Sequence, residues 1–570
     1  INKLIFFADI SVTLSKVRMN NEDTEYVKKE NLIIVDLPKD FKTDDIIDLQ
    51  IEYTAQPNSG FFYLNPEDGY SSWLGGWYPM LWGNKSFSSG KISISVPENL
   101  YAITNGALQE VENLDGWKTY NYEIQKPANF TFAYGKYKKY SQTSDSLDFS
   151  VYLLEENSEK AELYLNSSIE IIEFLKKKVY GFYPFDEYGI IEVTANYPGS
   201  SENGFTAIGR DWMRDTDYHF PTFAHEIGHL WWGNYIIGKG ALMSEAFAQF
   251  SYYLFMEEKY GRNVAENYLN WGEWRYDQAK FKYFAQIEPD IILNKPLAST
   301  SLTNHTLANT KGMSVLISLR NTIELDAMLA GIRAAQMKYP HSLLTIDELL
   351  DEIQNFTAID LMRFRKDWIY STNCPQIKGN KDLNIDGNTV SGNIEFSNWD
   401  KDLEVELGLY SGTQEEIRKI HLKPGTNNIN FKSTIELDAV TFDPHYKLVL
   451  KTDDYQNLEH LGKAIAAWYN GDNELVIEEV MRQVELNPTS IISQIYAGKI
   501  LYHFAQDADS AIKSFDYVLE QPQTFKEFPQ YLPTIYSTLS KIYYEKGDEE
   551  KGLEFKEKAE KLINKWILDF

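Results

Sequence analysis

The run His-Glu-Ile-Gly-His at positions 225 to 229 constrains this chain more than any other segment. In an α-helix, side chains four residues apart lie on one face, about 6 Å apart. His225 and His229 are therefore spaced to bind one tetrahedral Zn²⁺, at roughly 2.1 Å from each ring nitrogen. Glu226 projects about 100° around the helix, where it can deprotonate a water molecule. The segment predicts two zinc ligands and a general base; the alternative is a chance match in which both histidines only pack.

A catalytic zinc needs a third protein ligand and one open coordination position. Downstream of the histidines, Gly238 and Gly240 interrupt the chain, and an apolar helical pattern resumes at Leu242. We expect Glu245 in the first turns of this second helix, from which it can face the histidine pair. Glu245 is therefore the predicted third ligand. The alternative interpretation is a solvated carboxylate, which the dipole at a helix N-terminus favours.

These segments resemble the gluzincin aminopeptidases, the family of aminopeptidase N and leukotriene hydrolase. The family pattern is HExxH, then Trp-Gly-Asn, then a glutamate in an Asn-Glu-Gly-Phe-Ala context. The corresponding segments here are HEIGHLWWGN and SEAFA, joined by a shorter connection than in the family. The resemblance covers about the first three-quarters of the chain. It implies one zinc ion on His225, His229 and Glu245, a thermolysin-like catalytic domain, and hydrolysis of peptides from a free N-terminus.

A second matching segment lies upstream, in YPGSSENGFTAIG. In the family, a Gly-x-Met-Glu-Asn loop lines the substrate cleft, and its glutamate binds the α-amino group of the peptide. Gly199, Glu202 and Asn203 keep this pattern, whereas Ser201 replaces the methionine. A carboxylate at a set distance from zinc can pair with an ammonium group and so admit only chain ends. The alternative is a surface turn, because Asn-Gly is a strong hairpin signal.

The tyrosine that stabilises the oxyanion in the family is replaced in this chain. The family carries Tyr-x-Lys-Gly in a helix after the metal site, and the matching stretch here is NTKGMSVL. Asn309 stands in the tyrosine position, before Lys311 and Gly312. The loss of one oxyanion donor typically costs about 10² to 10³ in rate. Asn309, with its shorter amide donor, is the candidate catalytic residue; His305 and an unaligned tyrosine are the alternatives.

The charge balance argues against several classes of partner. Lys and Arg total 55 against 83 Asp and Glu, a formal net charge of −28. The electrostatic field of this net charge repels nucleic acid and anionic membranes and attracts peptide amines, although a need for solubility alone explains much of the charge. No apolar run reaches the roughly 18 residues of a membrane span. We expect a soluble protein without nucleic-acid partners; a leader or anchor removed before Ile1 leaves the compartment open.

The 570 residues predict a multidomain α+β architecture with four domains. Residues 1–141 are rich in strand-like runs and resemble the family's N-terminal β domain, where Glu67 and Asp68 are the acids nearest a second amine-binding position. Residues 142–375 become mostly helical and carry the predicted chemistry, as in a thermolysin-like zinc domain. Residues 376–452 return to alternating apolar positions, the pattern of a small β-sandwich.

The last segment, residues 453–570, is helical and repeats itself. The runs YNGDNELVIEEV, FAQDADSAIKSF and YEKGDEEKGLEF align, and the longer second gap contains QTFKEFPQYLP. Such spacings, with a small-residue turn between two helices, resemble tetratricopeptide repeats. Three units can bind a protein partner or pack on the catalytic domain. We favour packing, because three repeats is about the minimum for stability.

Two classes of function follow from these patterns. The favoured one is a zinc aminopeptidase in which Glu226 moves a proton from water to the leaving amine. The alternative, which Asn309 keeps open, is a peptidase-like scaffold or binding protein that holds zinc with weak or no turnover. Endopeptidase activity is disfavoured because Glu202 would block one end of the cleft.

Overall fold

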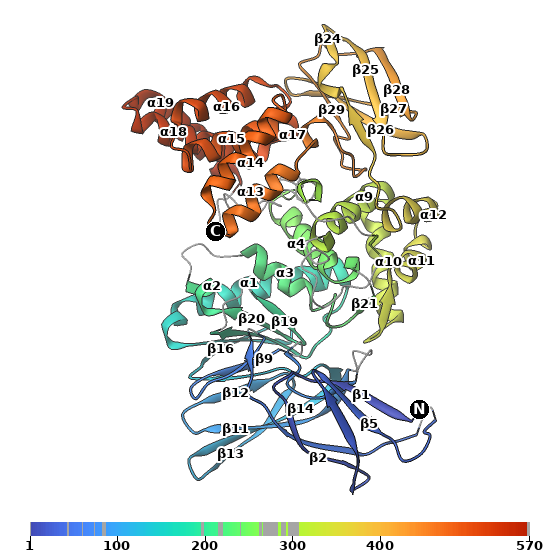
Figure 1. Cartoon of the computed structure of the whole chain (residues 1–570), viewed down its shortest axis with the longest axis vertical. Coiled ribbons are helices and arrows are strands. Elements are labelled where there is room, and N and C mark those ends of the chain that lie inside the picture. Colours follow the sequence, from blue (N-terminus) through green and yellow to red (C-terminus); the bar gives the residue numbers. More distant parts are fainter. Residues whose placement is uncertain are drawn as a thin grey trace. The chain divides into compact units, whose positions relative to one another are not determined.

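The computed structural model describes residues 2–566 except 43–44, 60, 73–74, 82–86, 195–198, 215–219, 240, 262–264, 266–282, 287–291 and 294–306. The chain forms two compact units. One comprises Ile1–Gly238 and Gln336–Leu344, and the other comprises Lys239–Ala335 and Thr345–Phe570. Figure 1 labels many of the helices and strands of both units. The four domain boundaries expected from the sequence stay predictions.

The first unit opens with antiparallel strands, which confirms the β-rich N-terminal region. The strands pair in the orders β10-β1-β5-β4, β3-β2-β6, β11-β14-β13 and β12-β15-β9-β8-β7. Alternate residues are buried in strands such as β2, β5 and β14, as expected for sheets with one face on a core. The bounds are β1 (Lys3–Phe7), β2 (Thr13–Met19), β3 (Glu22–Asp23), β4 (Tyr26–Lys29), β5 (Leu32–Asp36), β6 (Leu49–Thr54), β7 (Asn58–Ser59), β8 (Phe62–Leu64), β9 (Gly69–Ser71), β10 (Met80–Leu81), β11 (Ser88–Pro97), β12 (Tyr101–Thr104), β13 (Ala107–Leu114), β14 (Trp117–Ala128) and β15 (Phe132–Gly135).

A mixed sheet of order β16-β17-β18-β20-β19 carries the candidate residue Glu202 on its last strand. Its strands are β16 (Lys138–Ser144), β17 (Leu147–Leu153), β18 (Glu187–Val193), β19 (Ser200–Glu202) and β20 (Phe205–Gly209). The three central strands are parallel, and β20 is buried throughout. Parallel strands covered on both faces have continuous apolar runs, such as FTAIG here. Helix α1 (Ala161–Phe174) lies between β17 and β18 in the chain, and α2 (Arg210–Arg214) and α3 (Phe220–Gly228) follow β20.

The second unit begins with helices. Their bounds are α4 (Glu245–Tyr260), the π-helical turn η5 (Ala308–Gly312), α9 (Met313–Ile323), α10 (Leu325–Lys338), α11 (Ile346–Gln354) and α12 (Leu361–Phe364). Arg320 of α9 joins α9 to α4: it donates to the Glu257 carboxylate over 2.7 Å and to the Tyr253 hydroxyl over 2.9 Å. The second helix expected from the apolar pattern therefore forms, and it starts at Glu245 itself.

Strands return after residue 375, as the alternating pattern predicted. They are β23 (Gln376–Lys378), β24 (Asn384–Asp386), β25 (Thr389–Ser397), β26 (Leu403–Ser411), β27 (Gln414–Leu422), β28 (Gly425–Lys432) and β29 (Ala439–Phe442). One sheet has the order β23-β25-β24 with β28 paired to β25, and the other has the order β27-β26-β29. Both sheets contribute to one apolar core, which includes Val390, Phe396, Val405 and Leu407.

The C-terminal helices form three successive pairs, α13 (Glu459–Tyr469) with α14 (Asn473–Leu486), α15 (Ile491–His503) with α16 (Ala508–Glu520), and α18 (Leu532–Glu545) with α19 (Glu549–Trp566). The short α17 (Thr524–Glu527) lies in the longer gap. Asp472, Asp507 and Asp548 each accept a hydrogen bond from the backbone N–H three residues on. This shared N-cap explains the aligned sequence runs; their assignment as tetratricopeptide repeats stays a prediction. No described helix is long and apolar enough to cross a membrane.

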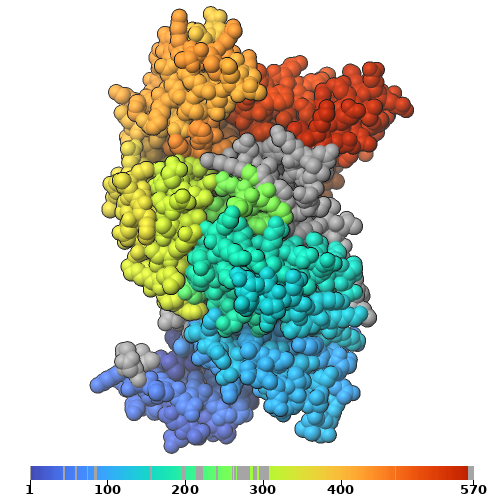
Figure 2. All heavy atoms as spheres, turned by 180° about the vertical axis from the view of Figure 1, so that it is seen from behind, coloured from blue at the N-terminus to red at the C-terminus, as the bar shows by residue number. Residues whose placement is uncertain are grey.

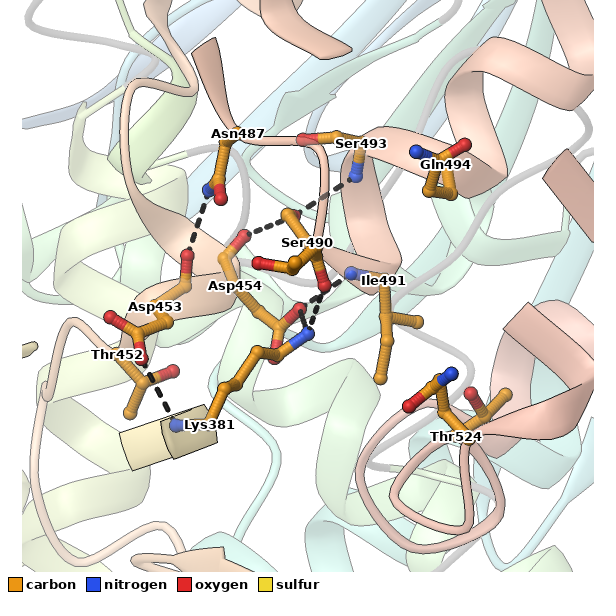
Figure 3. Close-up of polar contacts among 12 residues, drawn as sticks. Lys381, Thr452, Asp453, Asp454, Asn487, Ser490, Ile491, Ser493, Gln494 and Thr524 are labelled. Atoms are coloured by element: carbon orange, nitrogen blue, oxygen red, sulfur yellow. Dashed lines mark hydrogen bonds and ion pairs between the residues drawn. The ribbon is translucent and has the colours of Figure 1, made fainter. Parts of the chain in front are cut away.

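A buried polar junction ties the helical pairs to the β-sandwich. Asp454 is 1% exposed, and its Oδ1 accepts from Lys381 Nζ over 2.7 Å and from the Ile491 backbone over 2.6 Å. Asp453 accepts from the Lys381 backbone at its side chain and from Asn487 Nδ2 at its carbonyl (Figure 3). A second contact, from Lys526 Nζ to the Gly412 carbonyl, joins the orange and red regions that adjoin in Figure 2.

Candidate metal centre

The two histidines lie at the end of α3 as their spacing predicted. His225 is in the last turn, and the backbone N–H of His229 donates to the His225 carbonyl over 3.3 Å, which extends the helical geometry by one residue. Their Nε2 atoms are 3.1 Å apart and the rings are perpendicular. Two ligands of a tetrahedral zinc at roughly 2.1 Å each are about 3.4 Å apart. The pair therefore fits a shared metal ion.

The tautomer of His229 also suits a metal ligand. Its Nδ1 lies 2.9 Å from the carbonyl oxygen of Trp232. A carbonyl can only accept, so Nδ1 carries the proton and Nε2 keeps its lone pair. A backbone carbonyl that fixes the second ring nitrogen is the usual outer partner of a zinc-binding histidine.

The turn after the histidines is shaped by glycine and by two buried tryptophans. Gly233 has φ +116°, a conformation that favours glycine. Trp231 stacks on Tyr180 at 4.9 Å between ring centroids and donates to the Phe182 carbonyl over 3.0 Å. Trp232 donates to the Tyr180 hydroxyl over 2.9 Å. These contacts join the segment of residues 180–182 to the turn that follows the metal motif.

Glu245 is the first residue of α4, in the first turn where a carboxylate is favoured. One ligand atom of each of His225, His229 and Glu245 lies within 4.8 Å of the others. We call these three residues the ligand group; among the described residues it is the one such cluster of His, Cys, Asp and Glu. Two imidazole nitrogens and a carboxylate oxygen are a donor set that suits Zn²⁺ and leaves one position open.

Glu245→Ala is expected to weaken zinc binding by more than the roughly 100-fold that loss of an outer partner costs, because one of three ligands is removed. Metal content and a chelator competition measure this directly. Full stoichiometric retention at wild-type affinity would exclude Glu245 as a ligand. The exposed Glu258→Ala in the same helix is the matched control and should leave the affinity unchanged.

Glu226, the predicted general base, is half-buried and lies against the backbone of Gly199. A Cβ atom built on Gly199 would lie 2.9 Å from Cγ and 3.4 Å from Cδ of Glu226. Real Cβ contacts essentially never fall below 3.0 Å, so a side chain at 199 would push the Glu226 side chain away. The structure thus brings the glycine that precedes the SSEN segment, residues 200–203, directly against the candidate base.

Glu202 and Asn203 lie in a hairpin between β19 and β20, with Gly204 at φ +81°. The hairpin signal was right, but the surface-turn alternative is wrong: Glu202 is 1% exposed and Asn203 2% exposed. Glu202 Oε1 accepts from the Tyr70 hydroxyl over 2.9 Å and from the Ser200 hydroxyl over 3.1 Å. These two hydroxyl donors fix the position of that oxygen.

Tyr70 and Tyr78 are the neighbours of Glu202 that the sequence did not reveal. Tyr70 belongs to β9 and is fully buried. Burial and, to a smaller extent, the charge of Glu202 raise the pKa of Tyr78 to about 12, so this phenol is neutral at pH 7. The aromatic run FFYLNPEDGY was the only available signal for Tyr70, and its register on the sheet could not be read from it.

Asn234, from the Trp-Gly-Asn segment, holds the hairpin in place. Its Nδ2 donates to the Ser201 hydroxyl over 2.9 Å and to the Glu202 carbonyl over 3.3 Å. Asn203 Nδ2 donates in turn to the Asn234 carbonyl over 3.4 Å, and its Oδ1 accepts from the Asn129 backbone over 3.0 Å. The two motifs found separately in the sequence are thus one hydrogen-bonded structure.

Asn309 lies in η5, and its Nδ2 donates to Glu245 Oε2 over 3.3 Å. The structure therefore places it beside a predicted ligand; its role as an oxyanion donor stays a prediction. His305 lies outside the described residues.

Of the two acids named for a second amine position, Glu67 pairs with Lys136 at 3.0 Å, and Asp68 accepts from the Thr194 hydroxyl.

No protein-family model matches the sequence. Many solved structures share the fold, among them the following two. Legionella pneumophila aminopeptidase A, crystallised with aspartic acid, matches 99% of this chain and 74% of its own length, with a TM-score of 0.67 and 12% identity. A mutant of the M1 zinc metallopeptidase from Deinococcus radiodurans matches 65% of this chain and 87% of its own, with a TM-score of 0.54 and 14% identity. This chain therefore has the multidomain α+β fold of these two peptidases.

Proposed function

We propose that this chain is a zinc-dependent aminopeptidase, which removes residues from the free N-terminus of peptides. The observation that carries the proposal is the ligand group, in which two imidazoles and a carboxylate meet within 4.8 Å. The glutamate between the two histidines and the buried Glu202 supply the other chemistry that such a reaction needs. The fold shared with an aminopeptidase and a zinc metallopeptidase supports the same reaction class.

When bound, zinc would supply Lewis-acid polarisation of the scissile carbonyl and of water. His225, His229 and Glu245 would hold it. The Glu226 carboxylate accepts a proton from the attacking water as the new C–O bond forms. It then donates that proton to the leaving nitrogen as the C–N bond breaks, so the carboxylate is regenerated. The glycine backbone at 199 allows Glu226 to stay in place during both transfers.

Glu202 would recognise the α-ammonium group of the peptide. A carboxylate that is almost fully removed from solvent pairs more strongly with a cation than an exposed one. The hydroxyls of Tyr70 and Ser200 fix its Oε1, so the carboxylate is oriented before the substrate arrives. This arrangement favours chain ends over internal bonds and so an exopeptidase over an endopeptidase.

Asn309 supports the second candidate, a zinc-binding scaffold with weak turnover. Its amide donates to Glu245, one of the proposed zinc ligands, and it stands where the family has the tyrosine that donates to the oxyanion. A missing oxyanion donor would lower the rate by about 10² to 10³ without preventing zinc or peptide binding. The aminopeptidase and the scaffold therefore predict different turnover but the same zinc content.

The decisive experiment is hydrolysis of a panel of aminoacyl chromogenic amides by the zinc-loaded full chain. Each amide is paired with its N-acetylated form, and a chelator-treated sample gives the metal-free rate. The aminopeptidase proposal expects zinc-dependent turnover of the free-amine substrates alone. Stoichiometric zinc without turnover would favour the scaffold, and equal rates on blocked substrates would contradict the exopeptidase proposal.

Gly199→Ala is expected to lower kcat by up to about 10²-fold, the cost of a roughly 1 Å misplacement of a catalytic group, because its Cβ would push the Glu226 side chain out of position. Zinc content should be unchanged, since Gly199 contacts the base and not the ligand group. Gly90→Ala is the matched control: a Cβ there meets no atom within 4 Å. A normal kcat in Gly199→Ala would mean that Glu226 can move freely or is not the base.

A further inference from the structure

Asn309 is placed to act on a zinc ligand. Its Nδ2–H donates to Oε2 of Glu245, and both side chains are partly buried. A hydrogen bond to a charged acceptor is stronger than one between neutral groups, and partial burial strengthens it further. The contact joins residues that are 64 positions apart, so it depends on how η5 packs against α4.

The backbone of η5 is held unusually close to α4. A Cβ atom on Gly312 would lie 2.7 Å from Cβ of Ala246 and 3.1 Å from Cδ1 of Leu242, so the approach requires glycine at 312. Lys311, whose side chain is buried, donates from Nζ to the Ser371 carbonyl over 2.9 Å and secures the other side of the turn. Single π-helical turns of this kind occur frequently at functional sites.

This close packing explains why a side chain as short as asparagine reaches Glu245. The contact offers the asparagine a task other than the oxyanion donation that the family resemblance implied, which stays a prediction. His229 is held in a similar way, because its Nδ1 contacts the Trp232 carbonyl. Both contacts orient a ligand from outside the metal's own coordination sphere.

We propose that Asn309 is a positioning residue for the third zinc ligand: its amide holds the Glu245 carboxylate in the orientation that the metal requires. The inference rests on the proposed zinc site and deepens it. Outer partners of this kind typically account for 10- to 100-fold in metal affinity. Asn309 would thus be needed for metal retention, whatever the turnover of the enzyme.

The test is zinc affinity of the full chain, measured by competition with a chromogenic chelator. Asn309→Ala and the near-isosteric Asn309→Leu are expected to bind zinc about 10- to 100-fold more weakly than wild type. Ser314→Ala is the matched control: it removes a hydrogen bond to the Thr310 carbonyl in the adjoining helix and should leave the affinity unchanged. Thermal unfolding of the metal-free proteins identifies any variant that fails to fold, and Asn309→Leu preserves the packed volume if Asn309→Ala does not fold.

A double-mutant cycle shows whether Asn309 acts through Glu245. In the Glu245→Ala background, Asn309→Ala should cause no further loss of affinity, because the carboxylate that it orients is gone. The absorption bands of the Co²⁺-substituted protein should also change in Asn309→Ala and stay unchanged in Ser314→Ala. A residue that only stabilises the fold would leave those bands as they are.

The outcomes separate this inference from the proposed function. If wild type binds no zinc, or Glu245→Ala binds it normally, the proposed metal site is wrong. If wild type binds zinc through Glu245 but both Asn309 variants keep full affinity and an unchanged Co²⁺ spectrum, the inference is overturned and the proposed function stands. Additive losses in the double variant would also overturn it.

Discussion

Glu226→Gln is expected to retain stoichiometric zinc and to lose about 10² to 10⁴ in kcat, the usual contribution of a general base. The amide has nearly the same size and shape as the carboxylate, so the contact with Gly199 is preserved. It cannot accept a proton from water or return one to the leaving nitrogen. The loss should therefore appear in kcat, with little change in zinc affinity.

Three measurements make this result interpretable. Zinc content and thermal stability of Glu226→Gln should match those of wild type. Glu162→Gln, an exposed first-turn glutamate of α1, is the control for a simple change in charge and should be fully active. Near-normal turnover in Glu226→Gln would mean that another group activates the water.

Glu202→Ala is expected to lower kcat/KM on free-amine substrates by about 2 to 4 kcal/mol, or roughly 30- to 900-fold. Truncating one side of a desolvated charge pair leaves the substrate ammonium without its partner. The scissile carbonyl then loses the contact that positions it. The N-acetylated substrates lack the ammonium group, so their already low rates should change far less.

Kinetics on matched free and N-acetylated substrates distinguish a role of Glu202 in recognising the ammonium group from a role in folding. If free and acetylated substrates fall by the same factor in Glu202→Ala, the residue is structural, and the exopeptidase proposal loses its main support. A purely structural role for Glu202 in the β19–β20 hairpin predicts that pattern together with a lower melting temperature. Glu67→Ala is the control, because this exposed acid pairs with Lys136 and should leave the discrimination between the two substrates intact.

The parts of the site that could be predicted from sequence are those fixed by local geometry. The spacing of His225 and His229 depends only on the pitch of one helix, and Glu245 follows from the start of the next. Asp472, Asp507 and Asp548 recur because each caps a helix. In each case a few neighbouring residues decide the structure.

The contacts that could not be predicted join distant segments. The hydrogen bond from Tyr70 to Glu202 spans 132 positions and depends on the register of two separate sheets. Asn309 was identified by its alignment with a tyrosine, but its contact with Glu245 depends on the close approach of Gly312 to Ala246. Burial of the SSEN hairpin was missed for the same reason: Asn-Gly predicts a turn and says nothing about what covers it.

The junction around Asp454 determines where this chain can be shortened. A truncation after residue 452 looks natural, because the strands end before it and the helices begin after it. It would nevertheless remove both Asp453, which accepts from the Lys381 backbone, and Asp454, which pairs with Lys381 Nζ. The same cut removes helix α15, whose first residue donates to Asp454, so all the hydrogen bonds of the junction are lost together and Lys381 is left in contact with water. Expression of the β-sandwich alone therefore calls for a boundary after Tyr455, which keeps both acids with the strands.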